Sequence, residues 1–159
     1  MSLLDFLFPV ALGEAALRVL SPPGQTMSVS FIVKTLKLAK TNEFTEVNVP
    51  GLNGQPLRFI RGGTRTLSAV LSFDGRATNT DVRQPMRHVA ELMLVNRDTH
   101  APPVLSFEWR GESLQCVLES AVEEFRSVFP DGRPSRGRMR VVFKESRTLE
   151  QLQQEAALQ

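Results

Sequence analysis

The sequence predicts a mainly β, antiparallel fold, a β-sandwich or barrel with one α-helix packed on it. Residues 104–109 and 138–144 alternate apolar and polar side chains, the period of two that is typical of a strand with one buried face. Between them, residues 129–132 read Phe-Pro-Asp-Gly, which favours a chain reversal. Residues 82–95 show the spacing of three and four that is typical of an amphipathic helix. We therefore expect about six to eight strands and one helix.

Two hairpins are predicted in the first third of the chain. Residues 16–20 and 28–33 are apolar strand candidates on either side of a Ser-Pro-Pro-Gly turn. Asn53-Gly54 is a tight-turn signal because both residue types accept positive φ, and we expect this turn to join residues 47–49 to residues 57–60.

The next segment contains a glycine pair and a regular strand pattern. Residues 61–65 read Arg-Gly-Gly-Thr-Arg, and we interpret them as a plain turn. A phosphate-binding loop would need a longer spacing with Lys and Ser or Thr, and it would open a helix. Residues 67–73 then alternate, and four apolar residues are expected to face the core: Leu67, Ala69, Leu71 and Phe73.

Residues 114–125 fit two patterns. A helical stripe would use Leu114, Val117, Leu118, Ala121 and Phe125, whereas a strand would use Leu114, Cys116 and Leu118. We favour the strand because residues 110–112, Arg-Gly-Glu, are typical of a hairpin turn, which leaves little room for a helix to dock.

The predicted helix covers residues 82–95. Its expected apolar stripe consists of Val82, Met86, Val89, Ala90, Met93 and Leu94. Asp81 is expected to cap the helix with Gln84 as the reciprocal partner, and Pro85 falls in the first turn, where a missing N–H costs least.

Composition favours one globular domain. The chain has 159 residues, a formal charge of +2 and one cysteine, Cys116, so an internal disulfide and a cysteine-based zinc cage are excluded. Residues 2–12 are strongly apolar but too short to span a bilayer, and no Lys or Arg precedes them as in a signal peptide. We expect no membrane insertion.

We divide the chain into an N-terminal apolar arm (1–15), a β domain (16–147) and a C-terminal tail (148–159). The tail is predicted to be a short helix lying on a partner or a frayed terminus. The arm either packs on its own domain or inserts into a neighbouring subunit, because a large exposed apolar patch needs a partner. Its candidate contact residues are Leu3, Leu4, Phe6, Leu7 and Phe8.

No catalytic set is recognisable, and we predict neither an enzyme nor a cofactor or metal site. His88 lies within the predicted helix, and His100 follows Asp98 in a loop without a serine or cysteine motif beside it. Glu123 and Glu124 would point to opposite faces of a strand, so they cannot act together on one substrate.

An arginine cluster raises the question of nucleic acid. Its members are Arg133, Arg136, Arg138 and Arg140. Single-strand readers also need aromatic residues on the same face, and the nearest, Phe143, is expected on the opposite one. We therefore predict no specific nucleic-acid partner.

Several motifs in sequence order resemble a known family. Residues 102–109 read PPVLSFEW, 114–125 read LQCVLESAVEEF and 128–145 read VFPDGRPSRGRMRVVFKE, with a related first half over residues 44–75. About residues 16–147 are similar to the tube-protein module of contractile injection systems and contractile phage tails, of the tube-initiator or baseplate-hub-adaptor type. The C-terminal LysM domain of many relatives is absent from this sequence.

The resemblance implies a fold of the phage tail-tube type and a structural role. It implies a hexameric ring at the junction of tube and baseplate hub, with tube and hub, spike or baseplate proteins as partners, in a virion tail or injection particle made in the bacterial cytoplasm. Arg138, Arg140 and Lys144 join the arm residues as interface candidates. The alternatives are an ordinary tube subunit or tube-end cap, or a small domain that binds nucleic acid or an acidic partner through its Arg133–Arg140 face.

Overall fold

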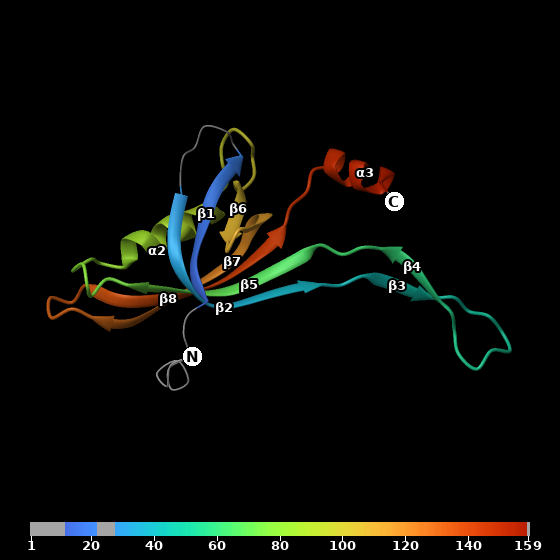
Figure 1. Cartoon of the computed structure of the whole chain (residues 1–159), viewed down its shortest axis with the longest axis horizontal. Helices are drawn as coiled ribbons and strands as arrows, with labels where there is room; N and C mark the ends of the chain where they lie inside the picture. Colours follow the sequence, from blue (N-terminus) through green and yellow to red (C-terminus); the bar gives the residue numbers. More distant parts are fainter. Residues whose placement is uncertain (1–11, 22–27, 159) are drawn as a thin grey trace.

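Eight strands, two α-helices and a short 3₁₀ helix are present in the computed structural model of this chain, which describes residues 12–21 and 28–158 (Figure 1). Six of the strands form a closed antiparallel barrel in the order β1-β2-β5-β8-β7-β6. Their bounds are Gly13–Ser21 (β1), Ser28–Lys40 (β2), Arg65–Asp74 (β5), Val104–Trp109 (β6), Glu112–Val128 (β7) and Pro134–Glu145 (β8). The predicted mainly β, antiparallel class is confirmed.

The barrel closes because β1 pairs with strands on both of its sides. It is antiparallel to β2, which confirms the first predicted hairpin, and also to β6, where Leu17 lies opposite Phe107. The strand begins at Gly13, so residues 13–15, which we assigned to the arm, lie in the barrel, and Ala15 is buried.

Alternate residues of the strands fill the core, as the period of two predicts. Leu67, Ala69, Leu71 and Phe73 of β5 are all buried, and so are Met139, Val141 and Phe143 of β8. Strand β6 departs from the pattern because Ser106, expected to be wet, is only 5% exposed. It lies between Arg18 of β1 and Gln115 of β7, whose longer side chains flank it on both sides.

The ambiguous residues 114–125 belong to strand β7, which confirms the strand interpretation. The preceding turn explains why: Arg110 and Gly111 both have positive φ (48° and 82°), the geometry of a two-residue hairpin loop. The second predicted reversal is also present, because Gly132 has φ 91° and its N–H donates to the carbonyl of Phe129.

The helix is shorter than predicted. Helix α2 spans Arg83–Ala90, and the chain tightens into the 3₁₀ helix η1, Glu91–Met93, before Leu94 becomes extended. A 3₁₀ turn brings residues three apart into line, so Leu92 follows Val89 into the core. Met93 and Leu94, which we expected in the apolar stripe, are instead 36% and 64% exposed.

The predicted capping of α2 by Asp81 and Gln84 is wrong. The N-cap is Val82, without a side-chain cap, although Pro85 does lie in the first turn. Asp81 accepts a hydrogen bond from the backbone N–H of Arg83 and pairs with its guanidinium at 2.7 Å. A guanidinium two residues away thus engages the carboxylate that would otherwise cap the helix.

Strands β3 (Glu43–Glu46) and β4 (Leu57–Arg61) form a separate antiparallel pair outside the barrel. This ribbon continues the line of β2 and β5 and projects to one end of the molecule (Figure 1). Our placement of the strand at residues 47–49 is wrong, because these belong to the tip loop. Positive φ occurs at Gly51, not at Asn53 or Gly54, so the tip is a wide loop rather than a tight turn.

The glycine pair before β5 has a packing role that differs from the predicted turn. The chain runs from β4 to β5 along the ribbon, and a Cβ at Gly63 would lie 1.8 Å from the carbonyl oxygen of Thr41 on the adjacent segment. Only a residue without a side chain allows this approach. At Gly62 the nearest atom would be 3.8 Å away, an ordinary contact.

Gly63→Ala is therefore expected to lower the free energy of unfolding by about 1–3 kcal/mol, as overpacking does, because a backbone segment must shift. Gly62→Ala is the matched control and should be much milder. Urea denaturation of both variants measures the difference. Equal losses would contradict the packing explanation.

Helix α3, Leu149–Ala157, confirms that the tail contains a short helix. Thr148 accepts from the N–H of Gln151, whose side chain accepts from the N–H of Thr148 in return, so a complete capping box starts it. The helix stands apart from the barrel on a short linker after β8 (Figure 1).

Candidate functional site

The three predicted cationic site residues lie on the outer face of β8, opposite its buried side chains. Arg140 and Lys144 are exposed, whereas Arg138 is half-buried and its Nε donates to Glu124 of β7 at 2.7 Å. The hydrogen bond from Arg138, together with its charge, lowers the pKa of Glu124 below its ordinary value. Two of the three cations are thus available for a partner, and the third is held within the sheet.

Neighbouring strands extend this face into a basic surface. It is built on four successive barrel strands, β2-β5-β8-β7. A hollow of about 620 Å³ lies on it, and the charged residues that line it are Lys34, Asp74, Arg76, Arg126, Arg136 and Arg138. Asp74 pairs with Arg76, so the balance is positive. Arg133 does not belong to this surface, because it binds Asp131 in its own turn and Asn79 in the loop between β5 and α2.

The four-stranded sheet β2-β5-β8-β7 has unpaired backbone along both outer strands. Strand β1 pairs with β2 only as far as Val33, so residues 35–40 have a ladder partner on the β5 side alone within the described chain. Strand β6 pairs with β7 only through Cys116, so among the residues that the structure describes, residues 117–128 pair with β8 alone. Such edges are templates for pairing with another chain.

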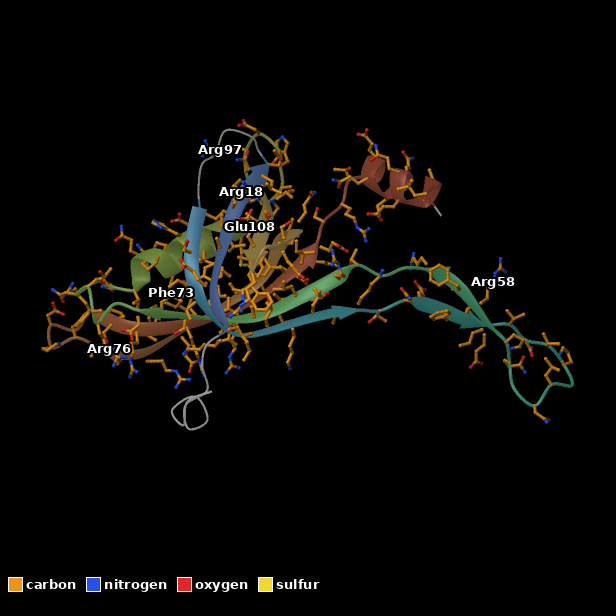
Figure 2. The ribbon with its side chains drawn as sticks, viewed as in Figure 1. Arg18, Arg58, Phe73, Arg76, Arg97 and Glu108 are labelled. Carbon is orange, nitrogen blue, oxygen red and sulfur yellow. The ribbon has the colours of Figure 1, made fainter. Side chains whose placement is uncertain are left out.

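The projecting ribbon is the second unusual surface, because it exposes large apolar side chains. Phe44 and Phe59 pack edge to face at 5.6 Å, yet both remain more than half exposed. The other exposed apolar residues of the ribbon and its tip are Val47, Val49, Leu52, Leu57 and Ile60. Figure 2 shows Arg58 on the ribbon and Arg76 at the opposite end of the molecule. An apolar surface of this kind marks an interaction site.

An apolar hollow of about 410 Å³ opens where β2 and β5 leave the barrel. Its apolar lining consists of Leu12, Leu36, Leu38, Leu67, Phe107, Trp109 and Leu114. The ring N–H of Trp109 donates to the carbonyl of Leu12, and this hydrogen bond holds Leu12 beside the hollow. The predicted arm contacts, Leu3, Leu4, Phe6, Leu7 and Phe8, lie outside the described residues.

Helix α3 is attached to the barrel through a chain of charges. Arg65 and Arg147 bind opposite oxygens of the buried Glu145 carboxylate at 2.6 and 3.0 Å, and Arg147 also pairs with Glu155 of α3. Burial opposes ionisation of Glu145, but the hydrogen bonds and charge of Arg65, with the charge of Arg147, outweigh it. The pKa of Glu145 is therefore below its ordinary value.

Residues with catalytic or metal-binding chemistry do not converge. His88 is exposed on α2, and His100 lies in an exposed loop with positive φ. Burial raises the pKa of the Cys116 thiol to about 12, which keeps it protonated and inert. Among the described residues, no group of three His, Cys, Asp or Glu side chains is arranged to hold a metal. No helix in the described ranges is both long and apolar enough to cross a membrane.

Sequence reasoning missed the ribbon surface and the unpaired edges. The alternation in residues 43–46 and 57–61 was visible, but which strands pair, and where each ladder stops, depends on contacts between distant segments. An ion pair between Arg18 of β1 and Glu108 of β6, at 3.0 Å, was also not expected; both residues are labelled in Figure 2.

These features define a β-barrel domain with open sheet edges and exposed apolar projections, a class of domain built to assemble with other chains. Residues 19–154 match the family model described as contractile injection system tube protein, and this match covers most of the chain. The chain belongs to the family of contractile injection system tube proteins. It is accordingly a tube-related component of a contractile injection system.

One solved structure supports the fold, and a second shows a weaker likeness. The Dit protein (gp 19.1) of phage SPP1, described as a paradigm of the hub adsorption apparatus in phages that infect Gram-positive bacteria, matches with a TM-score of 0.51 and 16% identity over 83% of this chain. This chain spans about half (49%) of that protein. The tail of an empty GTA particle, solved with C6 symmetry, matches with a TM-score of 0.47 and 11% identity over 84% of this chain and 90% of that one. No curated protein matches.

Proposed function

We propose that this chain forms or joins a hexameric ring at the junction between the tail tube and the baseplate hub, as a tube initiator or adaptor. The observation that carries the proposal is the pair of unpaired edges on the sheet β2-β5-β8-β7. Ring closure satisfies both edges of every copy, which no open arrangement does.

The ribbon supports the same function. It projects beyond the barrel with Phe44, Leu57 and Phe59 exposed, a surface that a neighbouring copy or an adjoining tube or hub protein would cover. The basic outer face, with Arg140 and Lys144 exposed, then meets acidic groups of a partner or lines the ring, where charge sets partner choice more than affinity. The apolar arm would add contacts between subunits.

The double variant Phe44→Ser/Phe59→Ser is expected to keep the melting temperature of the barrel and to lose assembly, because both rings lie outside the core. Native mass spectrometry and electron-microscopic class averages of the purified chain should show six copies for the wild type and monomers or incomplete rings for the variant. Leu20→Ser/Leu158→Ser, which also removes two exposed apolar side chains, is the matched control and should assemble normally.

Three outcomes would count against this function. A wild-type chain that stays monomeric at every concentration contradicts the ring. Rings that stack into long tubes without a partner favour an ordinary tube subunit over an initiator or adaptor. Salt-sensitive binding to DNA or RNA that Arg138→Glu/Arg140→Glu abolishes, with assembly unaffected, would favour the nucleic-acid alternative.

A further inference from the structure

Three arginines form a row along the outer face of strand β8. Arg136, Arg138 and Arg140 alternate with the buried Gly137 and Met139, so their side chains leave the sheet on the same side. Alternate residues of a strand are about 7 Å apart. Arg136 and Arg138 also line the hollow of about 620 Å³ on this face. We call these three residues the arginine row.

Strand β7 orients two of the three guanidiniums. Nε of Arg138 donates to Glu124 at 2.7 Å, and Nε of Arg136 donates to the hydroxyl of Ser127 at 3.0 Å. Ser127 is in turn hydrogen-bonded to the buried Ser135 at 2.8 Å. Among the described residues, the terminal amino groups of both arginines have no hydrogen-bond partner. Each guanidinium is thus held in place with free N–H groups, an arrangement suited to binding a carboxylate.

Arg140 completes the row without such an anchor. It is exposed, and its cross-strand neighbours are Val70 of β5 and Val122 of β7, whose side chains accept no hydrogen bond. Its whole guanidinium is therefore available to a partner. The row presents three cations in one line.

The surroundings of the arginine row add positive charge. Lys34, Arg76 and Arg126 line the same hollow. The one carboxylate in its lining, that of Asp74, is already held by Arg76 at 2.8 Å. The hollow therefore favours an anionic ligand over a cationic or apolar one.

The spacing of the row favours an extended acidic peptide. In an extended chain, alternate side chains also lie on one face about 7 Å apart, so three carboxylates at every second position would each meet one arginine. A single strand of nucleic acid would gain from stacking on exposed aromatic rings. The one aromatic residue that lines the hollow, Phe73, is only 6% exposed.

A second copy of the chain does not supply such a peptide. No two of the 17 acidic residues in this sequence are two positions apart, so it contains no segment with Asp or Glu at alternate positions. The ligand of the arginine row therefore belongs to a different protein.

We propose that the arginine row binds an extended segment of a different protein that carries Asp or Glu at every second position. Arg136, Arg138 and Arg140 each bind one carboxylate, and Lys34 and Arg126 attract the segment to the hollow. This inference rests on the proposed function, in which the basic outer face meets acidic groups of a partner, and it names the chemistry of that partner.

Two labelled peptides of equal length and composition, made of Ser and Glu, test the spacing. One has Glu at every second position and the other at every third, which sends successive carboxylates to opposite faces of an extended chain. Fluorescence anisotropy with the full chain should show roughly tenfold tighter binding of the first peptide, because more of its carboxylates reach the row. Binding should also weaken as salt rises, because exposed ion pairs are screened.

Arg136→Gln/Arg140→Gln should weaken binding of the first peptide roughly tenfold or more, because two of the three exposed ion pairs are lost. Arg87→Gln/Arg97→Gln is the matched control, since it removes two exposed arginines, one on α2 and one in the loop after η1, and it should bind like the wild type. Melting curves establish that both variants are folded.

Equal affinity for the two peptides would overturn the match of spacing, and unchanged binding by the row variant would overturn the site. Tighter binding of a single-stranded oligonucleotide than of the first peptide would show a nucleic-acid surface instead. Native mass spectrometry of the same samples separates this inference from the ring. Rings that bind no peptide contradict this inference alone, whereas a monomeric chain that binds the first peptide supports it and contradicts the ring.

Discussion

Phe107→Ala is expected to lower the free energy of unfolding by about 3–5 kcal/mol, the cost of a large-to-small change in a closed core. Phe107 is 2% exposed, and its ring centroid lies 6.1 Å from that of Phe31 and 5.4 Å from that of Phe143. These rings come from β2, β6 and β8, so removal of the central one leaves a cavity that several strands border. Neighbouring rings held by three strands cannot easily collapse into it.

Urea denaturation followed by circular dichroism measures this loss. Leu20→Ala is the matched control on the adjacent strand β1, where the side chain is 38% exposed, and it should change stability by no more than about 0.5 kcal/mol. A loss below about 1 kcal/mol for Phe107→Ala would mean that the barrel interior is not packed as described.

Glu145→Gln is expected to cost about 2–4 kcal/mol. Loss of one partner of a fully buried ion pair costs about 3–5 kcal/mol, and the value is discounted here because Arg65 and Arg147 are partly exposed. The amide keeps the shape of the side chain but removes the charge that both guanidiniums face. Helix α3 should also be released, because Arg147 links Glu145 to Glu155.

The pH dependence gives this prediction a second measurement. The pKa of Glu145 is below its ordinary value of 4.5, so the unfolded chain binds a proton more readily than the folded one. The contribution of this carboxylate is therefore complete above the ordinary value and is lost as pH falls below it. The stability difference between wild type and Glu145→Gln should shrink on acidification. A difference that stays constant down to low pH would contradict an ionised Glu145 as its source.

Local patterns predicted most of the individual strands. Alternation in residues 67–73 and 138–144 identified the buried faces of β5 and β8, because a strand with one wet face imposes a period of two on its own residues. The turns at residues 110–111 and 129–132 were equally local, since φ preferences belong to the residues that adopt them. Thr148 and Gln151 also carried a capping-box signal in sequence, although we had not used it.

Predictions failed where a more distant or competing contact decided the outcome. Asp81 binds Arg83 and therefore does not cap the helix. The apolar stripe ends early because the 3₁₀ helix η1 changes the helical period. Asn53 and Gly54 lie in a loop in which Gly51 is the residue with positive φ. The Gly62-Gly63 pair was recognisable as a special position. Glycine is required at position 63 because Thr41, on the opposite side of the ribbon, approaches its backbone closely.

For this protein the sequence alone determined the antiparallel β class, the faces of the strands and, through the order of its motifs, the tube-protein family. Only the tertiary structure decided that β1 closes a barrel, that β3 and β4 leave it as an exposed apolar ribbon, and that β2 and β7 end as open edges. The physical reason is the sequence separation over which each interaction acts. Side-chain alternation and turn preferences act within a few residues, whereas a strand ladder begins and ends where two distant segments meet.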